Sequence, residues 1–230
     1  MTKIVILTGA GISAESGLGT FRDEDGLWAK HRIEDVATPE GFDRNPQLVH
    51  HFYNARRRQA AAAQPNAAHI ALAQLEREPS VDLLIVTQNV DTLHEAAGAQ
   101  QVWHMHGQLD QALCGACGHR WAAPEEMQPQ DPCPACSEAA TRPDVVWFGE
   151  MPYHMDQIWD QIRTADIFAA IGTSGQVYPA AAFGQDAQRA GVHTVELNLA
   201  PSATVSDFSE THFGPATQVV PNWVASLCTA

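Results

Sequence analysis

Basic side chains are scarce in this sequence of 230 residues. It holds 13 lysines and arginines against 27 aspartates and glutamates, which gives a formal net charge of −14 at pH 7 with histidine neutral. A protein whose main task is to grip nucleic acid or an anionic membrane presents a basic face to it. We therefore expect no direct nucleic-acid partner and no membrane partner.

Long apolar runs are also missing. No run approaches the roughly 18–20 residues that a membrane-spanning helix needs. The first residues, MTKIVILTGAG, lack the layout of a secretory signal peptide. These two absences predict a cytoplasmic protein. With 45% hydrophobic and 17% charged residues, the chain can still build a substantial core, and wholesale disorder is excluded.

The sequence does contain an alternation of buried strands and helices. Near-continuous apolar runs are typical of strands that are buried on both faces. Such strands are expected over Lys3–Leu7, Val81–Thr87, Asp166–Gly172 and Val192–Leu197, with a weaker one over Thr217–Val220. Helices are expected between them, over Pro46–Ala63, Asn66–Glu76, Met155–Thr164 and Ala180–Ala190. This order predicts an α/β fold with a Rossmann-like, doubly wound parallel sheet.

Two segments, Phe21–Pro46 and Cys114–Arg142, break the alternation and are interpreted as parts of a smaller inserted module. The second contains two Cys-x-x-Cys pairs with fifteen residues between them. Two such pairs can form tight knuckles that complete a tetrahedral four-thiolate site. Four protein ligands leave no position for water, so the expected zinc ion is structural. Its predicted ligands are Cys114, Cys117, Cys133 and Cys136.

Other interpretations of these cysteines carry less weight. Two disulfides are disfavoured because no secretion signal is present. A redox-active pair is disfavoured because a second matched pair is surplus to that chemistry. The fifth cysteine, Cys228, is expected to be inert.

A glycine turn directly follows the first expected strand. Gly9-x-Gly11-x-x-Ala14 satisfies a relaxed dinucleotide-binding fingerprint, in which the glycines allow close backbone approach to a pyrophosphate. A packing turn without a ligand is the alternative. A hydride-transfer enzyme would place an acidic residue about 20 residues further on, after a second strand. Phe21–Trp28 has no strand pattern. We therefore predict NAD bound in an unusual way, for a reaction other than hydride transfer.

Seven motifs in order make the chain resemble the sirtuins, the NAD-dependent protein deacylases, from about Ile4 to Val220. They are TGAGISAESGLGTFRDEDGLW, TQNVDTLHEAAG, HMHG, the two cysteine pairs, RPDVVWFGE, GTSGQVYPAA and ELN. The resemblance is strongest to the short bacterial class that prefers acidic acyl groups. It implies a single catalytic domain over residues 1–230. The implied large Rossmann-like lobe covers about residues 1–20, 66–108 and 145–230, and the small lobe about residues 21–65 (helical) and 109–144 (zinc module).

The resemblance also implies the reaction. The acyl-lysine carbonyl oxygen attacks the ribose carbon that carries nicotinamide, and nicotinamide leaves. The product is an alkylimidate that joins acyl-lysine to ADP-ribose. A histidine base then lets the ribose 2′-hydroxyl attack this imidate, and water yields free lysine and O-acyl-ADP-ribose.

The family pattern assigns the base to His106, whereas the residues alone do not separate it from His104. Asn89 and Asp91 are the other implied catalytic residues, in the nicotinamide pocket; an Asx turn or helix cap is their alternative.

The remaining NAD contacts are assigned by resemblance to the glycine turn, the segment after it and the ends of later strands. They are Gly9, Ala10, Gly11, Ala14, Phe21, Arg22, Trp28, Gln88, Asn89, Val90, Asp91, Gly172, Thr173, Ser174, Asn198, Leu199, Ala200 and Ala216.

A peptide-binding strand is implied over Val146, Trp147, Phe148 and Gly149, where an extended substrate would add by main-chain hydrogen bonds. Core packing is the alternative for Trp147 and Phe148. Acyl-lysine segments of other proteins are therefore the expected partners, and the chain is expected to be a monomer.

Tyr53 and Arg56 lie three residues apart in an expected helix, so they share a face. A phenol and a guanidinium together can hold the carboxylate of succinyl-lysine or malonyl-lysine, and the resemblance favours this role. We expect acetyl-lysine to be processed as well. A solvated helix face is the alternative, and is the expectation for Arg57 and Arg58.

Two rival functions share the NAD residues. One is a non-catalytic NAD or ADP-ribose sensor, which would need no histidine base. The other is mono-ADP-ribosyl transfer to protein, which would need no Tyr53/Arg56 pocket.

Overall fold

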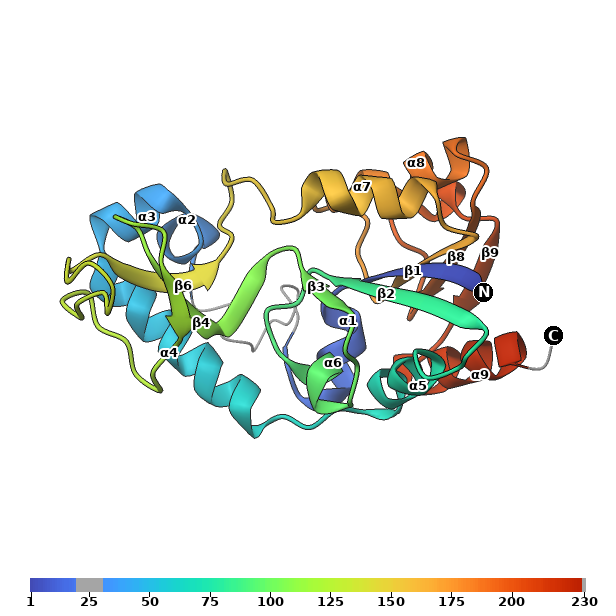
Figure 1. The fold of residues 1–230 in the computed structure, drawn as a ribbon, viewed down its shortest axis with the longest axis horizontal. Helices are drawn as coiled ribbons and strands as arrows, with labels where there is room; N and C mark the ends of the chain where they lie inside the picture. Colours follow the sequence, from blue (N-terminus) through green and yellow to red (C-terminus); the bar gives the residue numbers. More distant parts are fainter. Residues whose placement is uncertain (20–30, 229–230) are drawn as a thin grey trace.

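A six-stranded parallel sheet forms the larger part of the protein in the computed structural model, which describes residues 1–19 and 31–228 (Figure 1). The strand order is β3-β2-β1-β7-β8-β9, and each neighbouring pair is parallel. The strands are β1 (Thr2–Thr8), β2 (Val81–Thr87), β3 (Val102–His104), β7 (Ile167–Ile171), β8 (His193–Asn198) and β9 (Glu210–Phe213). The order reverses between β1 and β7, which is the switch point of a doubly wound sheet.

Alternate side chains of the strands fill two cores, one on each face of the sheet. Ile4 and Ile6 belong to one core, whereas Val5 and Leu7 belong to the other, because successive strand side chains point to opposite faces. Figure 1 shows α5 and α9 on one side of the sheet and α7 and α8 on the other. Their bounds are α5 Ala67–Leu75, α9 Ala216–Cys228, α7 Met155–Arg163 and α8 Phe183–Arg189. The predicted α/β fold class is thus confirmed.

The strand expected over Thr217–Val220 is wrong, because these residues lie in helix α9. Val220, Trp223 and Val224 are all buried against the core, and their spacing is that of one helix face. The last strand is β9 instead, which pairs with β8. Both β9 and β3 are short strands at the edges of the sheet, and neither carries the apolar run that identifies the central strands.

A second sheet has three antiparallel strands in the order β5-β4-β6, and it lies at one end of the molecule with three helices (Figure 1). The strands are β4 (Gly107–Cys114), β5 (Arg120–Ala122) and β6 (Thr141–Val145), and the helices are α2 (Ile33–Val36), α3 (Pro39–Arg44) and α4 (Pro46–Ala62). Thr38 and Asn45 cap α3 and α4 by accepting backbone N–H groups. Pro143 is accommodated because β6 is an edge strand, where a missing N–H costs little.

The expected helices are confirmed, with one refinement. The segment Ala180–Ala190 begins with the 3-10 turn η3 (Ala180–Ala182) before α8 starts. The remaining short elements are α1 (Ala10–Ser13), η1 (Ala14–Ser16), α6 (Leu93–Ala96) and η4 (Val205–Asp207). Across residues 1–19 and 31–228, no helix combines the length and apolar character needed to cross a membrane.

Candidate active site and metal centre

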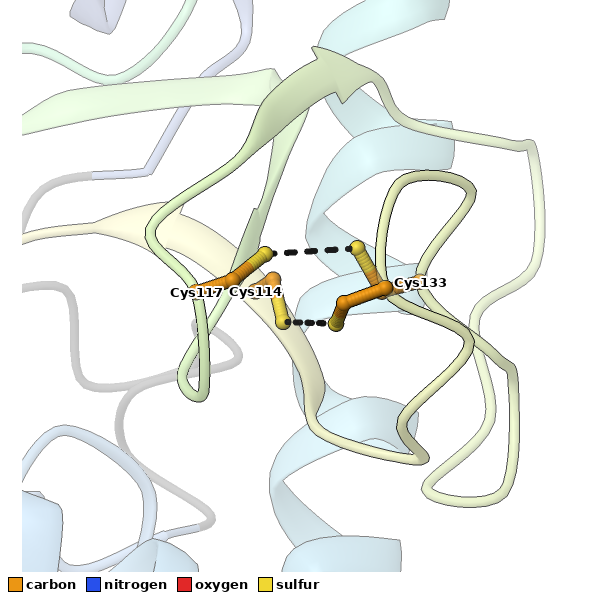
Figure 2. Close-up of side chains that lie close together, drawn as sticks. Cys114, Cys117 and Cys133 are labelled. Carbon is orange, nitrogen blue, oxygen red and sulfur yellow. Dashed lines mark hydrogen bonds between the residues drawn. The ribbon is translucent and has the colours of Figure 1, made fainter.

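The four cysteines at the end of β4 and in the loops beside it converge, and Figure 2 shows Cys114 and Cys117 across from Cys133. Cys114 Sγ lies 3.7 Å from Cys136 Sγ, and Cys117 Sγ lies 3.8 Å from Cys133 Sγ. Four sulfurs bonded to zinc at about 2.3 Å form a tetrahedron with edges of about 3.8 Å. All four sulfurs lie within 4.8 Å of one another, so the donor set fits a tetrahedral zinc ion.

The same geometry decides against the rival interpretations of the cysteines. A disulfide needs a sulfur–sulfur distance of about 2.05 Å, and all five cysteines are free. The Ala135 N–H donates to Cys133 Sγ at 3.4 Å, as in a ligand knuckle. Cys228 is exposed in α9.

The glycine turn after β1 packs directly on the turn after β7, at the switch point of the large sheet. Gly11 N donates to the Gly172 carbonyl at 2.9 Å. A Cβ atom on Gly11 would lie 2.7 Å from Gly172 Cα, and one on Gly172, whose φ is +63°, would lie 2.4 Å from Ile12 N. Only glycine permits this approach. The helix that follows is shorter than the dinucleotide fingerprint predicts, because α1 has four residues.

Asn89 and Asp91 follow β2 at the same edge of the sheet and are both buried. The Asn89 side-chain amide donates to the Gly9 carbonyl at 3.1 Å and to Ser13 Oγ at 3.2 Å. Ser13 Oγ in turn donates to Asp91 at 3.2 Å. Burial raises the pKa of Asp91, and contacts with Leu93 N and Ser13 act against it. Our sequence analysis missed Ser13, whose only signal was its place in the glycine motif.

The two histidines before β4 have different surroundings. His106 Nδ1 lies 3.2 Å from the Gln88 carbonyl, and burial lowers its pKa. His104 is buried between the Asn89 carbonyl, 3.2 Å from Nδ1, and Glu95 Oε1, 2.7 Å from Nε2. The geometry therefore separates two residues that the sequence alone did not.

Tyr53 and Arg56 lie on α4, and Arg56 is near Asp91, which follows β2. Trp147 Nε1 donates to Tyr53 Oη at 3.1 Å, and burial raises the pKa of the tyrosine. Arg56 is half-buried, and burial lowers its pKa, whereas the nearby Tyr53 and Asp91 raise it. The Arg56 guanidinium also lies 6.0 Å from the ring centre of Phe52. The expected proximity of the phenol and the guanidinium is thus present.

The solvent-facing position expected for Arg57 is wrong. Its side chain is 8% exposed. Nε donates to the Leu109 carbonyl at 2.7 Å, and Nη1 donates to Asn54 Oδ1 at 2.8 Å. Arg58 does face solvent, where it pairs with Glu126. Arg57 therefore joins α4 to β4, a role that helix periodicity did not reveal.

Residues Val146–Gly149 form an irregular segment and turn after β6, so the strand expected there is wrong. The Val146 N–H donates to the His106 carbonyl at 2.9 Å. Trp147 is buried in the core, whereas Phe148 is 46% exposed. The Glu150 carboxylate fixes the turn, because it accepts from the Trp147 N–H at 2.8 Å and from both terminal nitrogens of Arg142.

The ends of β7 and β8 supply the remaining described candidates. Asn198 Nδ2 donates to the Thr173 carbonyl at 2.6 Å, which ties the two strand ends together. Leu199 and Ala200 are exposed beyond β8, and Ala216 begins α9. The structure also places Gly9, Gln88, Val90, Gly172 and Ser174 directly after β1, β2 and β7, and Ala10 and Ala14 at the starts of α1 and η1. Phe21, Arg22 and Trp28 lie outside the described residues.

Comparisons with known proteins agree with this arrangement. The model of the Sir2 family matches residues 9–179. The NAD-dependent protein deacylase of Salmonella typhimurium is 56% identical over 225 residues, covering 96% of this chain and 82% of that protein. The one from Caulobacter vibrioides is 54% identical over 229 residues, covering 98% and 96%. A Sir2 homologue–NAD complex has a TM-score of 0.91 at 36% identity, covering 99% of this chain and 90% of the other. This chain belongs to the Sir2 family.

Proposed function

We propose that this protein is an NAD-dependent protein-lysine deacylase that prefers succinyl-lysine and malonyl-lysine and also accepts acetyl-lysine. One observation carries the proposal: Arg56 of α4 interacts electrostatically with Asp91, which is buried after β2 beside Asn89 and Ser13. Arg56, which can bind a carboxylate, thus lies near the polar cluster of Asp91, Asn89 and Ser13. The deacylase names of the relatives support the same activity.

The chemistry of the polar cluster fits NAD. When bound, NAD supplies a nicotinamide leaving group and an electrophilic ribose carbon. Asp91 would accept from the nicotinamide carboxamide, and Asn89 would orient the ribose. The turns containing Gly11 and Gly172, with Thr173 and Ser174, offer N–H groups and hydroxyls at the switch point, where α/β sheets bind ligands. Asn198 would take the adenosine ribose.

His106 is the proposed general base. Its Nδ1–H donates to the Gln88 carbonyl, and this leaves the lone pair on Nε2. Burial lowers the pKa of His106, so the imidazole is neutral, and able to take a proton from a ribose hydroxyl, near neutral pH.

Tyr53 and Arg56 are the proposed acyl-selective pair. The Tyr53 oxygen accepts from Trp147 Nε1, which leaves the phenol proton for a ligand. Burial opposes the charge on Arg56, and an incoming carboxylate compensates by bidentate pairing. A neutral acetyl group cannot do this, so acidic acyl groups bind better.

The two sheets support a division of labour. The proposed large lobe, about residues 1–20, 66–108 and 145–230, binds NAD. The proposed small lobe, about residues 21–65 and 109–144, supplies the acyl pocket and holds zinc in its four-cysteine site. An extended peptide would contact the turn at Val146, with the Val146 carbonyl accepting from the acyl-lysine Nε–H.

Mass spectrometry of two matched peptides, one succinylated and one acetylated, tests the proposal with and without NAD. We expect faster loss of the succinyl group, only with NAD, and formation of O-succinyl-ADP-ribose. Faster deacetylation would contradict the acyl pocket alone. If neither peptide reacts, NAD binding without turnover would favour a sensor, and ADP-ribose attached to protein would favour mono-ADP-ribosyl transfer.

A further inference from the structure

Glu196 is a buried acid near the end of β8, and its side chain is 1% exposed. It lies on the same face of the strand as Asn198, because side chains two residues apart share a face. Val195 and Leu197, which point the other way, belong to an apolar core. A buried carboxyl group costs free energy unless it is hydrogen-bonded, so the partners of Glu196 indicate what it does.

One oxygen of this carboxyl group makes all of its described hydrogen bonds. Oε1 accepts from the Ser202 N–H at 3.0 Å and from Asn198 Nδ2 at 3.3 Å. Ser202 belongs to the loop after β8, and the next residue, Ala203, donates its N–H to the Ser174 carbonyl at 3.2 Å, after β7. The other oxygen, Oε2, is buried without a hydrogen-bond partner in the part of the chain that the structure describes. Oε1 therefore joins the Asn198 side chain to the loop that follows it.

The partners of the Asn198 amide allow it one orientation. Nδ2 faces two accepting oxygens, the Thr173 backbone carbonyl at 2.6 Å and Glu196 Oε1. Oδ1 faces the Leu199 N–H at 3.2 Å, which can only donate. A side-chain amide has two N–H donors and an oxygen with two lone pairs. Both donors are thus used within the chain, and one lone pair of Oδ1 remains for a ligand.

We propose that Glu196 is a positioning residue for the adenosine half of NAD, which holds the Asn198 amide so that Oδ1 accepts from a ribose hydroxyl. The inference rests on the adenosine-ribose role proposed for Asn198. It does not depend on acyl selectivity or on turnover.

Close packing of the two loops makes the position of Asn198 sensitive to Glu196. A Cβ atom on Gly175, after β7, would lie 2.6 Å from Thr204 Oγ1, after β8. The Gly172 N–H donates to the Leu197 carbonyl at 3.0 Å. Without Oε1, the Ser202 N–H and one N–H of Asn198 lose their acceptor. The loop after β8 can then shift against the turn after β7, and the freed amide N–H competes with Oδ1 for the ribose.

Calorimetric titration of the full chain with ADP-ribose tests this role without substrate or turnover. In Glu196→Leu, we expect the Kd for ADP-ribose to rise about tenfold, because the acceptor of two N–H groups is lost. Glu196→Gln keeps an oxygen at the position of Oε1 and replaces only Oε2, which has no partner, so it should restore most of the affinity. An unchanged Kd in Glu196→Leu, or equal losses in both variants, would overturn the proposal.

Steady-state kinetics of the same variants separates positioning from general damage to the fold. We expect the KM for NAD to rise about tenfold in Glu196→Leu, while kcat and the KM for the acyl peptide change by less than about twofold. A partly unfolded variant would instead show a lower kcat with both KM values unchanged, and that result would contradict positioning.

The matched control is Glu210→Leu on β9, since Glu210 pairs with His193 and His212 and not with either loop. An equal rise of the ADP-ribose Kd in this control would count against a specific role for Glu196. If the Kd values behave as expected but the unmodified chain removes no acyl group, the proposed deacylase function fails and the role of Glu196 in cofactor binding stands.

Discussion

Different interactions stabilise the two parts of this protein that contain its two sheets. The six-stranded sheet has an apolar core on each face, built from alternate residues of its strands. The three-stranded sheet and its helices share one smaller apolar core. Polar contacts also join the elements of this part. Arg57 joins α4 to β4, and Arg120 pairs with the buried Asp144 at 2.8 Å. Four cysteines close the far end.

This difference has a functional side. At the edge of the apolar sheet, Asn89 contacts the glycine turn and Asp91 contacts Ser13 of α1. The other sheet and its helices place Tyr53 and Arg56 beside that edge through directional polar contacts. NAD chemistry would then depend mainly on the first sheet, and acyl selectivity on the second. Perturbations of each part should have separable effects.

Removal of zinc should produce the largest effect. In the Cys133→Ser variant, or after chelation, the three-stranded sheet loses a crosslink that contributes on the order of 10 kcal/mol in small zinc modules. Hydrogen exchange should accelerate in residues 107–145 and in α4, while amides of the six-stranded sheet stay protected. Cys228→Ser is the matched control, since that thiol is exposed in α9. Equal loss of protection in both sheets would contradict the comparison.

Acid should weaken the six-stranded part through His69, which is fully buried on α5. Burial lowers its pKa from 6.5 to about 4. Below pH 6.5 the unfolded chain binds a proton that the folded chain does not, so the free energy of unfolding falls as pH drops toward 4. The loss should reach about 3 kcal/mol.

Urea unfolding as a function of pH checks this, with the exposed His51→Gln as control. Between about pH 6.5 and 4, the free energy of unfolding should fall less steeply with decreasing pH in His69→Gln. In the control it should fall as in the unmodified chain. An equal pH dependence in His69→Gln and in the unmodified chain would show that His69 does not cause the loss of stability in acid.

Arg57→Met should destabilise the chain by about 2 kcal/mol, because it leaves the buried Leu109 carbonyl and Asn54 without their donor. Arg58→Met removes the neighbouring guanidinium, whose partner Glu126 is at the surface, and should cost under about 1 kcal/mol. Thermal or urea unfolding of both variants decides between them. Similar costs for the two would mean that Arg57 is not a structural link.

The sequence predicted the two-faced sheet well because its central strands bury both faces, and such strands carry near-continuous apolar runs. It failed at Thr217–Val220, where a short apolar run is equally consistent with one turn of a helix. It also failed for Arg57, because two adjacent arginines in a helix give no sign of which one finds buried carbonyls. The candidate site is proposed mainly from its motifs, whereas the distinct environments of His104 and His106 required the fold.

The most direct test of the account is the ratio of kcat/KM for a succinyl-lysine peptide to that for its acetyl-lysine counterpart, in the unmodified chain and in Arg56→Met. We predict that the ratio exceeds one in the unmodified chain and falls roughly 100-fold in the variant, about 3 kcal/mol for a lost charge-assisted pair. Arg58→Met should leave the ratio as it is. An Arg56→Met ratio equal to that of the unmodified chain would contradict the assignment of acyl selectivity to α4.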